Sequence, residues 1–457
     1  MKLLLISIDT LRSDHLGCYG YNWTRNRTSP FIDSLAGGGV VFENHYATDV
    51  PTPPSYTSLF HGQRAIKNGI YTFFQYPREF SCPTPSMAER FFRKKHRTGA
   101  ISNLCMLYPW LHAGFTDIYK PGNRFQGGSA EEVTREALRW LRDFGQGDFF
   151  LFVHYWDTHG PYLRRSHERY RPLFSPEEYR DRAPDMKYLE INPELGKSYR
   201  EWHERIGDPQ SPEENLALYD ANVRYVDDQI KALFEGMKAM GVNPDDLFVM
   251  VTSDHGEAFG EYGFWDHYSG YRNIAQVPLI VRGAGVRPGR VQSYTQHVDV
   301  LPTLCELAGI EWQQRLCGKS MAGLLAGGGA PVRDFAVVEA GYIAVQRMLL
   351  RDEFALVHTM WRAGDAADVF PRADAPAHTR WQADRKHIKT FELFDLRTDR
   401  DQVHDLSDTC KDRTDQMRIA LEDWVIENTG AGGLDRLRLI SAKRNMSDAA
   451  FLVPSPK

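Results

Sequence analysis

Three predominantly apolar runs constrain the fold of this chain more than any other feature. They are Lys2–Ile8, Phe149–Tyr155 and Leu247–Thr252. A strand that is apolar along its whole length is buried on both faces, as in the parallel sheets of α/β proteins. Between the runs, Glu131–Phe144 and Glu213–Met237 carry apolar residues at helical spacing. The sequence therefore predicts an α/β fold with a large mixed sheet between helices.

The last third of the chain differs in character. It follows a glycine-rich joint at Ala326–Pro331, and its segments indicate the strands of a separate small sheet. At 457 residues the chain is longer than one typical domain. We therefore predict a large α/β domain over residues 1–330 and a small α+β domain over residues 331–457. The elements predicted for the small domain are Phe335–Val338, Ile343–Leu350, the strand in ELFDL and the helix Asp412–Ile426.

Charge and cysteine content exclude some partners. The formal net charge of −5 argues against a general nucleic-acid-binding protein. The six cysteines show no paired spacing, which fits a reducing compartment. The N-terminal run leads into Asp9 and Arg12 without a cleavage site, and no later run is long enough to span a bilayer. We expect a cytoplasmic protein with no nucleic-acid or membrane partner; a homo-oligomer is compatible with this composition.

Metal-ligating side chains follow two of the predicted strands. Asp9 comes directly after the first run, and Asp254 and His255 come after the third. Adjacent residues of a straight strand point to opposite faces, so the Asp254–His255 pair must sit where the strand breaks and can face one ion together. Singly, these residues also fit a loop carboxylate, a helix cap and a surface histidine. Together with the Thr52 oxygen they form a four-ligand shell for a divalent cation.

The stretch VPTPPSYTSLFHG, Val50–Gly62, indicates a loop that enters a helix. Proline is tolerated in a first helical turn, so Thr52 is predicted to lie just before that turn. The free N–H groups of a helix N-terminus suit an anion, and a nucleophilic hydroxyl beside them suits attack on a phosphorus or sulfur ester. A capping threonine is the simpler interpretation of this stretch alone.

Several blocks of the chain resemble the sulfatase branch of the alkaline phosphatase superfamily. They are SIDTLRSDHLGCYG, SPFIDSLAGGGVVFENHYA, TSDHGEAFGEYGFWDH…VPLIVRGAG, HVDVLPTLCELAGI and ELFDLRTDRDQVHDLS. They occur in the family's order from residue 3 to about residue 426. The resemblance implies an alkaline-phosphatase-like fold and a metal-dependent ester hydrolase. It places the metal ligands at Asp9, Thr52, Asp254 and His255, the nucleophile at Thr52, and substrate contacts at His159, His267 and Asn103.

The chain departs from the family pattern at three points. Thr52 occupies the position that authentic sulfatases convert to formylglycine, and threonine cannot undergo that conversion. Tyr56 stands where the family has an arginine, and Thr10 stands where it has a second aspartate. His255 replaces the asparagine of calcium-dependent members. An imidazole ligand favours Mn²⁺ or Zn²⁺ over Ca²⁺.

These departures favour phosphate esters, either monoesters or diesters, or phosphonate esters over sulfate esters as the small anionic substrate. The alternatives are a sulfatase, a phosphotransferase with the same site, and a binding protein on an inactive sulfatase fold. We expect His159 and His267 to face the metal across the substrate, to supply a general acid, and to be oriented by Asp157 or Asp266. A second metal held by these histidines is the competing interpretation.

Two further features are less specific. His154 lies within the second apolar run and is expected to be a core histidine with a satisfied hydrogen bond. Residues 163–212 are rich in Arg, Glu, Pro and Tyr and show no periodicity. We predict that they form an insertion on the binding face of the sheet.

Overall fold

A computed structural model of the chain shows two sheets with helices packed on them. It describes residues 1–73, 75, 80–81, 84–104, 108–122, 128–165, 167–183, 200–201, 203–261, 264–312, 316–342, 344–362, 390–429 and 433–445. Part of the predicted insertion, residues 184–199, lies outside these ranges. In the part of the chain that is described, no helix has the length and apolarity needed to cross a bilayer.

The large sheet has eight strands in the order β12-β2-β11-β8-β1-β7-β5-β6. Strands β8, β1, β7, β5 and β6 run parallel, whereas β11 is antiparallel to both of its neighbours, so the sheet is mixed. Strands β1 and β7 coincide with two of the apolar runs, and β8 begins one residue later than predicted. The bounds are β12 (Gly289–Val291), β2 (Val40–Phe42), β11 (Leu279–Arg282), β8 (Phe248–Thr252), β1 (Lys2–Ile8), β7 (Phe149–Tyr155), β5 (Arg97–Ile101) and β6 (Asp117–Tyr119).

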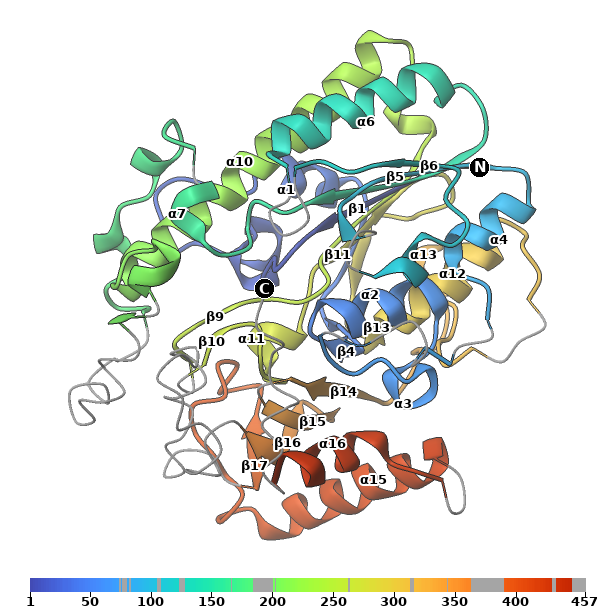
Figure 1. Cartoon of the computed structure of the whole chain (residues 1–457). Helices are drawn as coiled ribbons and strands as arrows, with labels where there is room; N and C mark the ends of the chain where they lie inside the picture. The colour runs from blue at the N-terminus through green and yellow to red at the C-terminus, as the bar shows by residue number, and fades with distance from the viewer. Residues whose placement is uncertain are drawn as a thin grey trace.

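Helices cover both faces of the large sheet (Figure 1). Alternate side chains of β1 enter two different apolar clusters, Leu4 and Ile6 in one, Leu3 and Leu5 in the other. This alternation is the reason the strand is apolar along its whole length. The first cluster includes α1 (Pro30–Gly37), α6 (Ala130–Phe144) and α10 (Pro212–Ala239). The second includes α2 (Thr52–His61), α4 (Met87–Arg93) and α12 (Val300–Leu307).

The small sheet has five strands in the order β17-β16-β15-β14-β4. Four come from the C-terminal part: β14 (Phe335–Gly341), β15 (Ala344–Arg351), β16 (Phe354–Arg362) and β17 (Phe391–Asp395). The fifth, β4 (Asp49–Val50), comes from the N-terminal part and pairs in parallel with β14. Helix α15 (Lys411–Thr429) packs on this sheet through Met417 and Trp424, and α16 (Arg436–Asn445) lies beside it (Figure 1). The domain boundary near residue 330 stays a prediction, because the small sheet draws on both parts of the chain.

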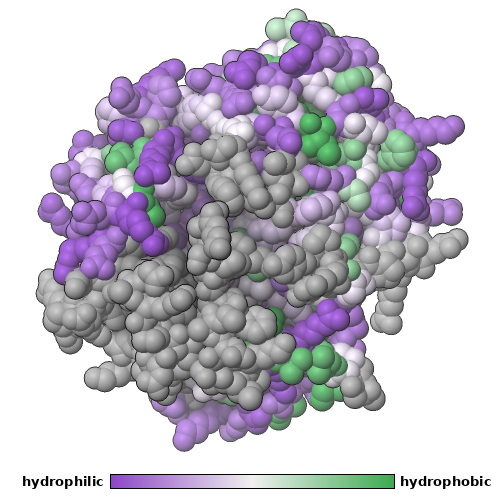
Figure 2. Space-filling model, in the orientation of Figure 1, coloured by the Kyte–Doolittle hydropathy of each residue, from purple (hydrophilic) through white to green (hydrophobic). Residues whose placement is uncertain are grey.

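Short elements complete the framework. They are α3 (Ala65–Asn68), α7 (Tyr162–Arg165), α11 (Arg272–Ala275), α13 (Ala322–Leu325), the pair β9 (Ala258–Phe259) with β10 (Trp265–Asp266), and the pair β3 (His45–Tyr46) with β13 (Thr295–Gln296). On the face shown in Figure 2, the coloured residues are mostly hydrophilic and apolar ones gather in small groups.

Strand register brings the polar residues to one edge of the large sheet. Ile8 of β1 pairs with Tyr155 of β7, and Ser7 pairs with Thr252 of β8. All three strands are parallel, so the segments that follow them leave the sheet at the same edge. The residues after Ile8, Tyr155 and Thr252 are therefore neighbours in space.

Candidate active site

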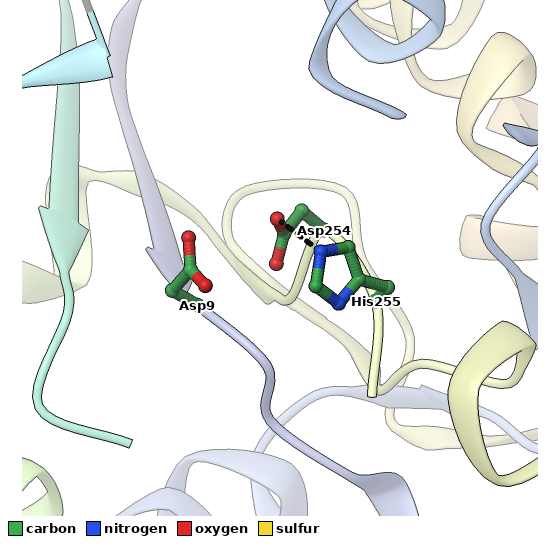
Figure 3. Close-up of side chains that lie close together, drawn as sticks. All are labelled: Asp9, Asp254 and His255. Carbon is green, nitrogen blue, oxygen red and sulfur yellow. Dashed lines mark ion pairs between the residues drawn. The ribbon is translucent and has the colours of Figure 1, made fainter. Parts of the chain in front are cut away.

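Asp9, Asp254 and His255 form a compact, buried group at this edge (Figure 3). One ligand atom from each lies within 4.8 Å of the others, and no side chain of the three is exposed to solvent. As predicted from the break in the strand, β8 ends at Thr252, and the next residues turn so that Asp254 and His255 face the same point. The sequence prediction that these three residues meet agrees with the geometry.

Asp9 is held from several sides but keeps one free oxygen. Its amide donates to the Tyr155 carbonyl at 2.9 Å, and the Thr158 hydroxyl donates to the Asp9 carbonyl. Oδ2 of its carboxylate lies 3.2 Å from Nε2 of His154. Oδ1 is buried and makes no hydrogen bond to any residue that the structure describes. A buried carboxylate oxygen without a partner is the donor that a cation requires.

Asp254 and His255 complete the candidate metal site. The Thr10 amide donates to Oδ1 of Asp254 at 3.1 Å, so the residue that replaces the second aspartate contributes a backbone N–H. Nδ1 of His255 lies 2.9 Å from the Gly256 carbonyl, which can only accept. The proton therefore sits on Nδ1 of the neutral ring, and Nε2 presents its lone pair, the arrangement found in metal-bound histidines. Nε2 lies 3.1 Å from Oδ2 of Asp254.

The electrostatics of the group favour a bound cation. Burial raises the pKa of Asp254 to about 6, and the nearby Asp9 carboxylate adds to the rise. Burial also raises the pKa of Asp9. Two buried carboxylates with raised pKa values repel each other, and a divalent ion between them would remove that cost. The donor set of two carboxylates and one imidazole fits such an ion.

Thr52 lies beside the group, at the N-terminus of α2. It is the first helical residue rather than the residue before the helix, because Pro51 takes the preceding extended position. Its buried Oγ1 is 3.0 Å from Nε2 of His255. Ser55, the other hydroxyl of this turn, donates to the Asp254 carbonyl at 2.7 Å. The hydroxyl of Tyr56, at the family's arginine position, lies 2.8 Å from Oγ of Ser7.

The two predicted catalytic histidines lie together next to this group. The ring of His267 stacks on His255 with centroids 4.4 Å apart, and His159 meets His267 edge-on at 5.0 Å. His267 therefore lies beside a candidate metal ligand, whereas we had expected it across the substrate from the metal. Burial lowers the pKa of His159 to about 4, so this ring is neutral at neutral pH. Its Nδ1 lies 2.5 Å from the Gly160 carbonyl.

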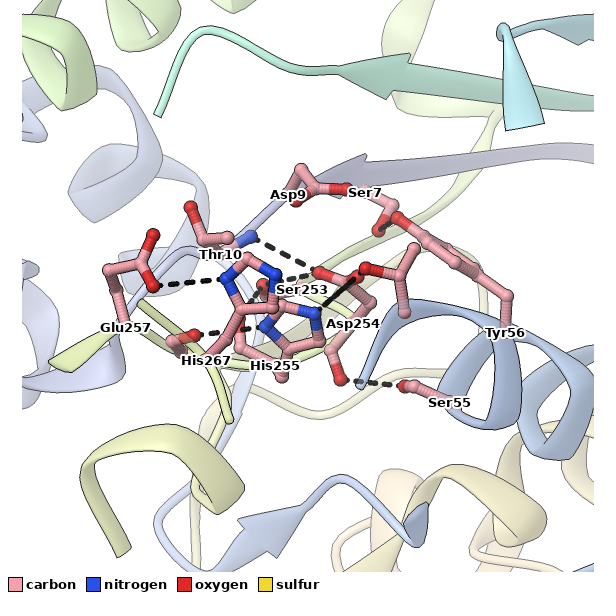
Figure 4. A network of polar contacts seen from close by, with 12 residues as sticks. Ser7, Asp9, Thr10, Ser55, Tyr56, Ser253, Asp254, His255, Glu257 and His267 are labelled. Atoms are coloured by element: carbon pink, nitrogen blue, oxygen red, sulfur yellow. Dashed lines mark hydrogen bonds and ion pairs between the residues drawn. The ribbon is translucent and has the colours of Figure 1, made fainter. Parts of the chain in front are cut away.

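Glu257 is a site residue that the sequence analysis missed. Its Oε1 lies 3.1 Å from Nδ1 of His267, so Glu257 is placed to orient this ring (Figure 4). The predicted role of Asp157 or Asp266 stays a prediction. Burial raises the pKa of Glu257 well above its usual range. A raised pKa favours the protonated carboxyl, which can donate its hydrogen to Nδ1 of His267. Glu257 stands two residues beyond His255 in SDHGE. An acidic residue so close to two candidate metal ligands is the sequence signal that could have identified it as a site residue.

Two further polar side chains lie at the same edge. Asn103 follows β5 and is buried, and its Nδ2 has no hydrogen-bond partner among the described residues. Arg165 ends α7, and its buried Nε has no hydrogen-bond partner among the described residues. Burial lowers the pKa of Arg165, whereas its charge lowers the pKa of Asp9 and of His159. The sequence analysis did not single out Arg165.

The structure offers no second metal cluster in the parts of the chain that it describes. Asp9, Asp254 and His255 are the only group there with three or more mutually close His, Cys, Asp or Glu ligand atoms. His159 and His267 do not join any such group.

Comparison with known proteins is consistent with the fold and the motifs. A family model described as Sulfatase matches residues 2–310. Choline-sulfatase of Rhizobium meliloti (strain 1021) is 23% identical over 334 residues, which cover 63% of this chain and 64% of that protein. Iduronate 2-sulfatase of Mus musculus is 26% identical over 337 residues, which cover 62% of this chain and 59% of that protein. The chain thus spans less than two thirds of the length of either relative.

A solved structure extends the likeness to the fold. Phosphonate monoester hydrolase of Agrobacterium radiobacter matches with a TM-score of 0.70 at 18% identity, over 93% of this chain and 95% of that chain. The predicted alkaline-phosphatase-like α/β fold, with a large mixed sheet between helices and a smaller C-terminal sheet, is confirmed. The family model matches well over half of the chain, and on that ground the chain belongs to the sulfatase family.

Proposed function

We propose that the protein is a metal-dependent hydrolase that cleaves phosphate or phosphonate esters through Thr52. The single observation that carries this proposal is the position of the Thr52 hydroxyl, 3.0 Å from Nε2 of His255 at the start of a buried helix. Asp9, Asp254, His255 and Thr52 would hold the ion. Mn²⁺ or Zn²⁺ suits this donor set better than Ca²⁺, because one ligand is an imidazole. When bound, the ion would lower the hydroxyl pKa and offset charge on the ester oxygens.

The residues around Thr52 support an anionic substrate. In the first turn of α2 only Thr52 keeps a backbone N–H for a ligand, because residues 53 and 54 are prolines and the Ser55 amide donates to the Pro51 carbonyl at 3.1 Å. The unpaired Nδ2 of Asn103 offers another donor. The guanidinium of Arg165, which interacts electrostatically with Asp157 and Asp9, supplies positive charge next to the group. In this proposal the Thr52 oxygen bonds to phosphorus while the ester oxygen leaves, and water later releases the phosphoryl group from Thr52.

The absence of an aldehyde is the reason to place phosphorus esters first. Formylglycine members of the family release sulfate by collapse of a hemiacetal, and a threonine cannot form one. A sulfate ester on Thr52 would be slow to hydrolyse, whereas phosphate esters of hydroxyl residues turn over by direct attack of water. Sulfate esters remain the second candidate, because the matched relatives are named as sulfatases.

A panel of esters with one common leaving group tests the proposal. We expect the protein, loaded with Mn²⁺, to cleave nitrophenyl phosphate, its methyl diester or the phenylphosphonate with kcat/KM about 10²-fold above nitrophenyl sulfate, a difference of about 2.7 kcal/mol. The Thr52→Ala variant, purified in parallel, gives the contaminating background. Hydrolysis of the sulfate alone would overturn the preference for phosphorus esters. No hydrolysis of any ester would overturn the proposed enzyme.

We further propose His267 as the general acid, since the Glu257–His267 pair holds a proton beside Thr52 and His255. His159, which is neutral, would instead make a hydrogen bond to the substrate. His267→Ala is expected to slow esters of poor leaving groups by about 10²- to 10⁴-fold, because general acid catalysis has that value. Nitrophenyl esters, which need no protonation, are expected to lose much less.

The leaving-group comparison includes Glu257→Gln as a matched variant. Its amide keeps a polar partner for Nδ1 of His267 but holds no acidic proton, so we expect a smaller loss with the same dependence on leaving group. Metal content is measured for each variant. Equal loss on both substrate types, together with a missing metal equivalent, would contradict the acid role and support a second ion.

A further inference from the structure

His154 is a buried histidine of the large sheet that contacts a candidate metal ligand, Asp9. It lies on β7 opposite Ser7 of β1, and its side chain is fully buried. Nε2 lies 3.2 Å from Oδ2 of Asp9, and Nδ1 lies 3.2 Å from Oγ of Ser102. The ring of His154 therefore links Ser102, which follows β5, to Asp9, which follows β1. It is a core histidine, as expected from the sequence, and its partner is Asp9.

The hydrogen bonds around the ring select one tautomer. Oγ of Ser102 lies 3.2 Å from Nδ1 of His154, and the carboxylate of Asp9 lies 3.2 Å from Nε2. Nδ1 is then the acceptor of the neutral ring, and Nε2 carries the hydrogen. The carboxylate of Asp9 can only accept when ionised, and Nε2–H donates to its Oδ2. In this arrangement, which we call the His154 relay, Nε2–H is the donor and Oδ2 of Asp9 is the acceptor.

Aromatic packing fixes the orientation of the relay. The ring of Phe152 stacks on His154 at an interplanar angle of 17°, and Tyr56 and Trp156 meet it edge-on. A ring enclosed in this way cannot turn without disturbing three neighbours. Its N–H therefore points at one oxygen of Asp9 in a fixed direction.

We propose that His154 is a positioning residue for the metal site: it holds Oδ2 of Asp9 so that Oδ1 alone faces the ion. The inference rests on the proposed function in one respect, that Asp9 is a metal ligand. Oδ1 is the buried oxygen that lacks a hydrogen-bond partner in the described structure. Thr10 supplies no second carboxylate after β1, so the direction of this single oxygen matters more than in a site with paired aspartates.

Divalent-ion affinity, measured by calorimetry with Mn²⁺ on metal-free protein, tests the proposal without any substrate. His154→Leu removes the donor to Asp9, and we expect about 10- to 100-fold weaker binding, the usual cost of losing a hydrogen-bond partner of a metal ligand. His154→Gln places an amide N–H near the position of Nε2 and is expected to bind within about threefold of wild type. His154→Asn places its amide near Nδ1 instead and is expected to behave like the leucine variant.

A second buried histidine provides the matched control. Nδ1 of His15 lies 2.6 Å from Oδ1 of Asp220, and both side chains are fully buried. Neither residue belongs to the candidate metal group. His15→Leu removes the same kind of buried histidine–aspartate contact, so we expect a lower Tm with unchanged Mn²⁺ affinity. A common loss of affinity in His15→Leu and His154→Leu would mean general destabilisation and would overturn the positioning role.

If His154→Leu does not fold, the comparison of His154→Gln with His154→Asn tests the positioning role of His154. The relay is supported if His154→Gln binds Mn²⁺ about as tightly as wild type and His154→Asn binds it at least about tenfold more weakly. Equal affinities for the two variants contradict it. If wild type binds no divalent ion, the metal site of the proposed function fails, which is a different result from equal affinities among variants that all bind.

Discussion

Replacing Thr52 with alanine is expected to abolish turnover while leaving the fold and the metal site intact. Thr52 is the only residue of the α2 start whose hydroxyl faces His255, at 3.0 Å. In a protease whose nucleophile has been removed, kcat falls by about 10⁶-fold. We expect a loss of at least about 10³-fold here, because the remaining ligands can still bind substrate and activate a water to some extent. The measurement is kcat on the best ester of the panel, with Mn²⁺ affinity and Tm recorded in parallel.

Two neighbouring substitutions sharpen this experiment. Thr52→Ser keeps a hydroxyl at the same place, and we expect activity within about tenfold of wild type, because only a methyl group is lost. Ser55→Ala removes the neighbouring hydroxyl, which is engaged with the Asp254 carbonyl. If Thr52→Ala kept wild-type kcat and Ser55→Ala lost it, Ser55 would be the nucleophile. Full activity in both alanine variants would remove the covalent mechanism altogether.

Removing the metal is the second change with a large expected effect. Dialysis against a chelator is expected to reduce activity to the Thr52→Ala background, and added Mn²⁺ or Zn²⁺ is expected to restore it. Asp254→Asn should have the same effect on activity without restoration at micromolar metal, because it removes a charged ligand. Full activity in the chelated protein, with metal shown to be absent by elemental analysis, would contradict a metal-dependent enzyme.

Asp254→Asn is also expected to stabilise the metal-free protein. The pKa of Asp254 is about 6 in the folded state, above the usual value, so folding binds a proton that the unfolded chain has released. The free energy of unfolding of wild type therefore falls as the pH rises from about 4 to about 6. Asparagine carries no such penalty, and it keeps an oxygen for the Thr10 amide.

The size and pH dependence of this effect separate it from ordinary repacking. A pKa of about 6 in place of the usual 3.8 corresponds to roughly 2–3 kcal/mol of stability. Chemical denaturation of metal-free protein should show Asp254→Asn more stable than wild type at pH 7.5 and similar to it at pH 4. A variant that is less stable than wild type at both pH values would contradict the repulsion between Asp9 and Asp254.

Sequence patterns predicted the elements that are buried on both faces and the residues that follow them. Strands β1 and β7 have their predicted bounds, and Asp9, Asp254 and His255 meet because parallel strands end at one edge. This part of the site is set by chain direction and strand register, which a continuous apolar run makes visible. The start of α2 was visible for a similar reason, because prolines mark a first helical turn.

Other features depend on contacts that no local pattern records. The hairpin between β15 and β16 turns at Asp352 and Glu353, which both have positive φ angles, 50° and 62°, although neither is glycine or asparagine. Without the usual turn residues, β16 was not predicted. Helix α16 was missed as well. The contacts of Glu257 with His267 and of His154 with Asp9 join side chains from different turns and strands, and they become apparent only when the register is known.

The pairing of β4 with β14 has a consequence for when the site can form. Asp49 and Val50 pair with Glu339 and Ala340 of β14. Thr52 begins α2 two residues after Val50. The N-terminal portion of a growing polypeptide would carry Thr52, the proposed nucleophile, long before the strand that pairs with β4 is synthesised. A ribosome-bound chain would therefore stay inert until its last third had emerged and closed on the first.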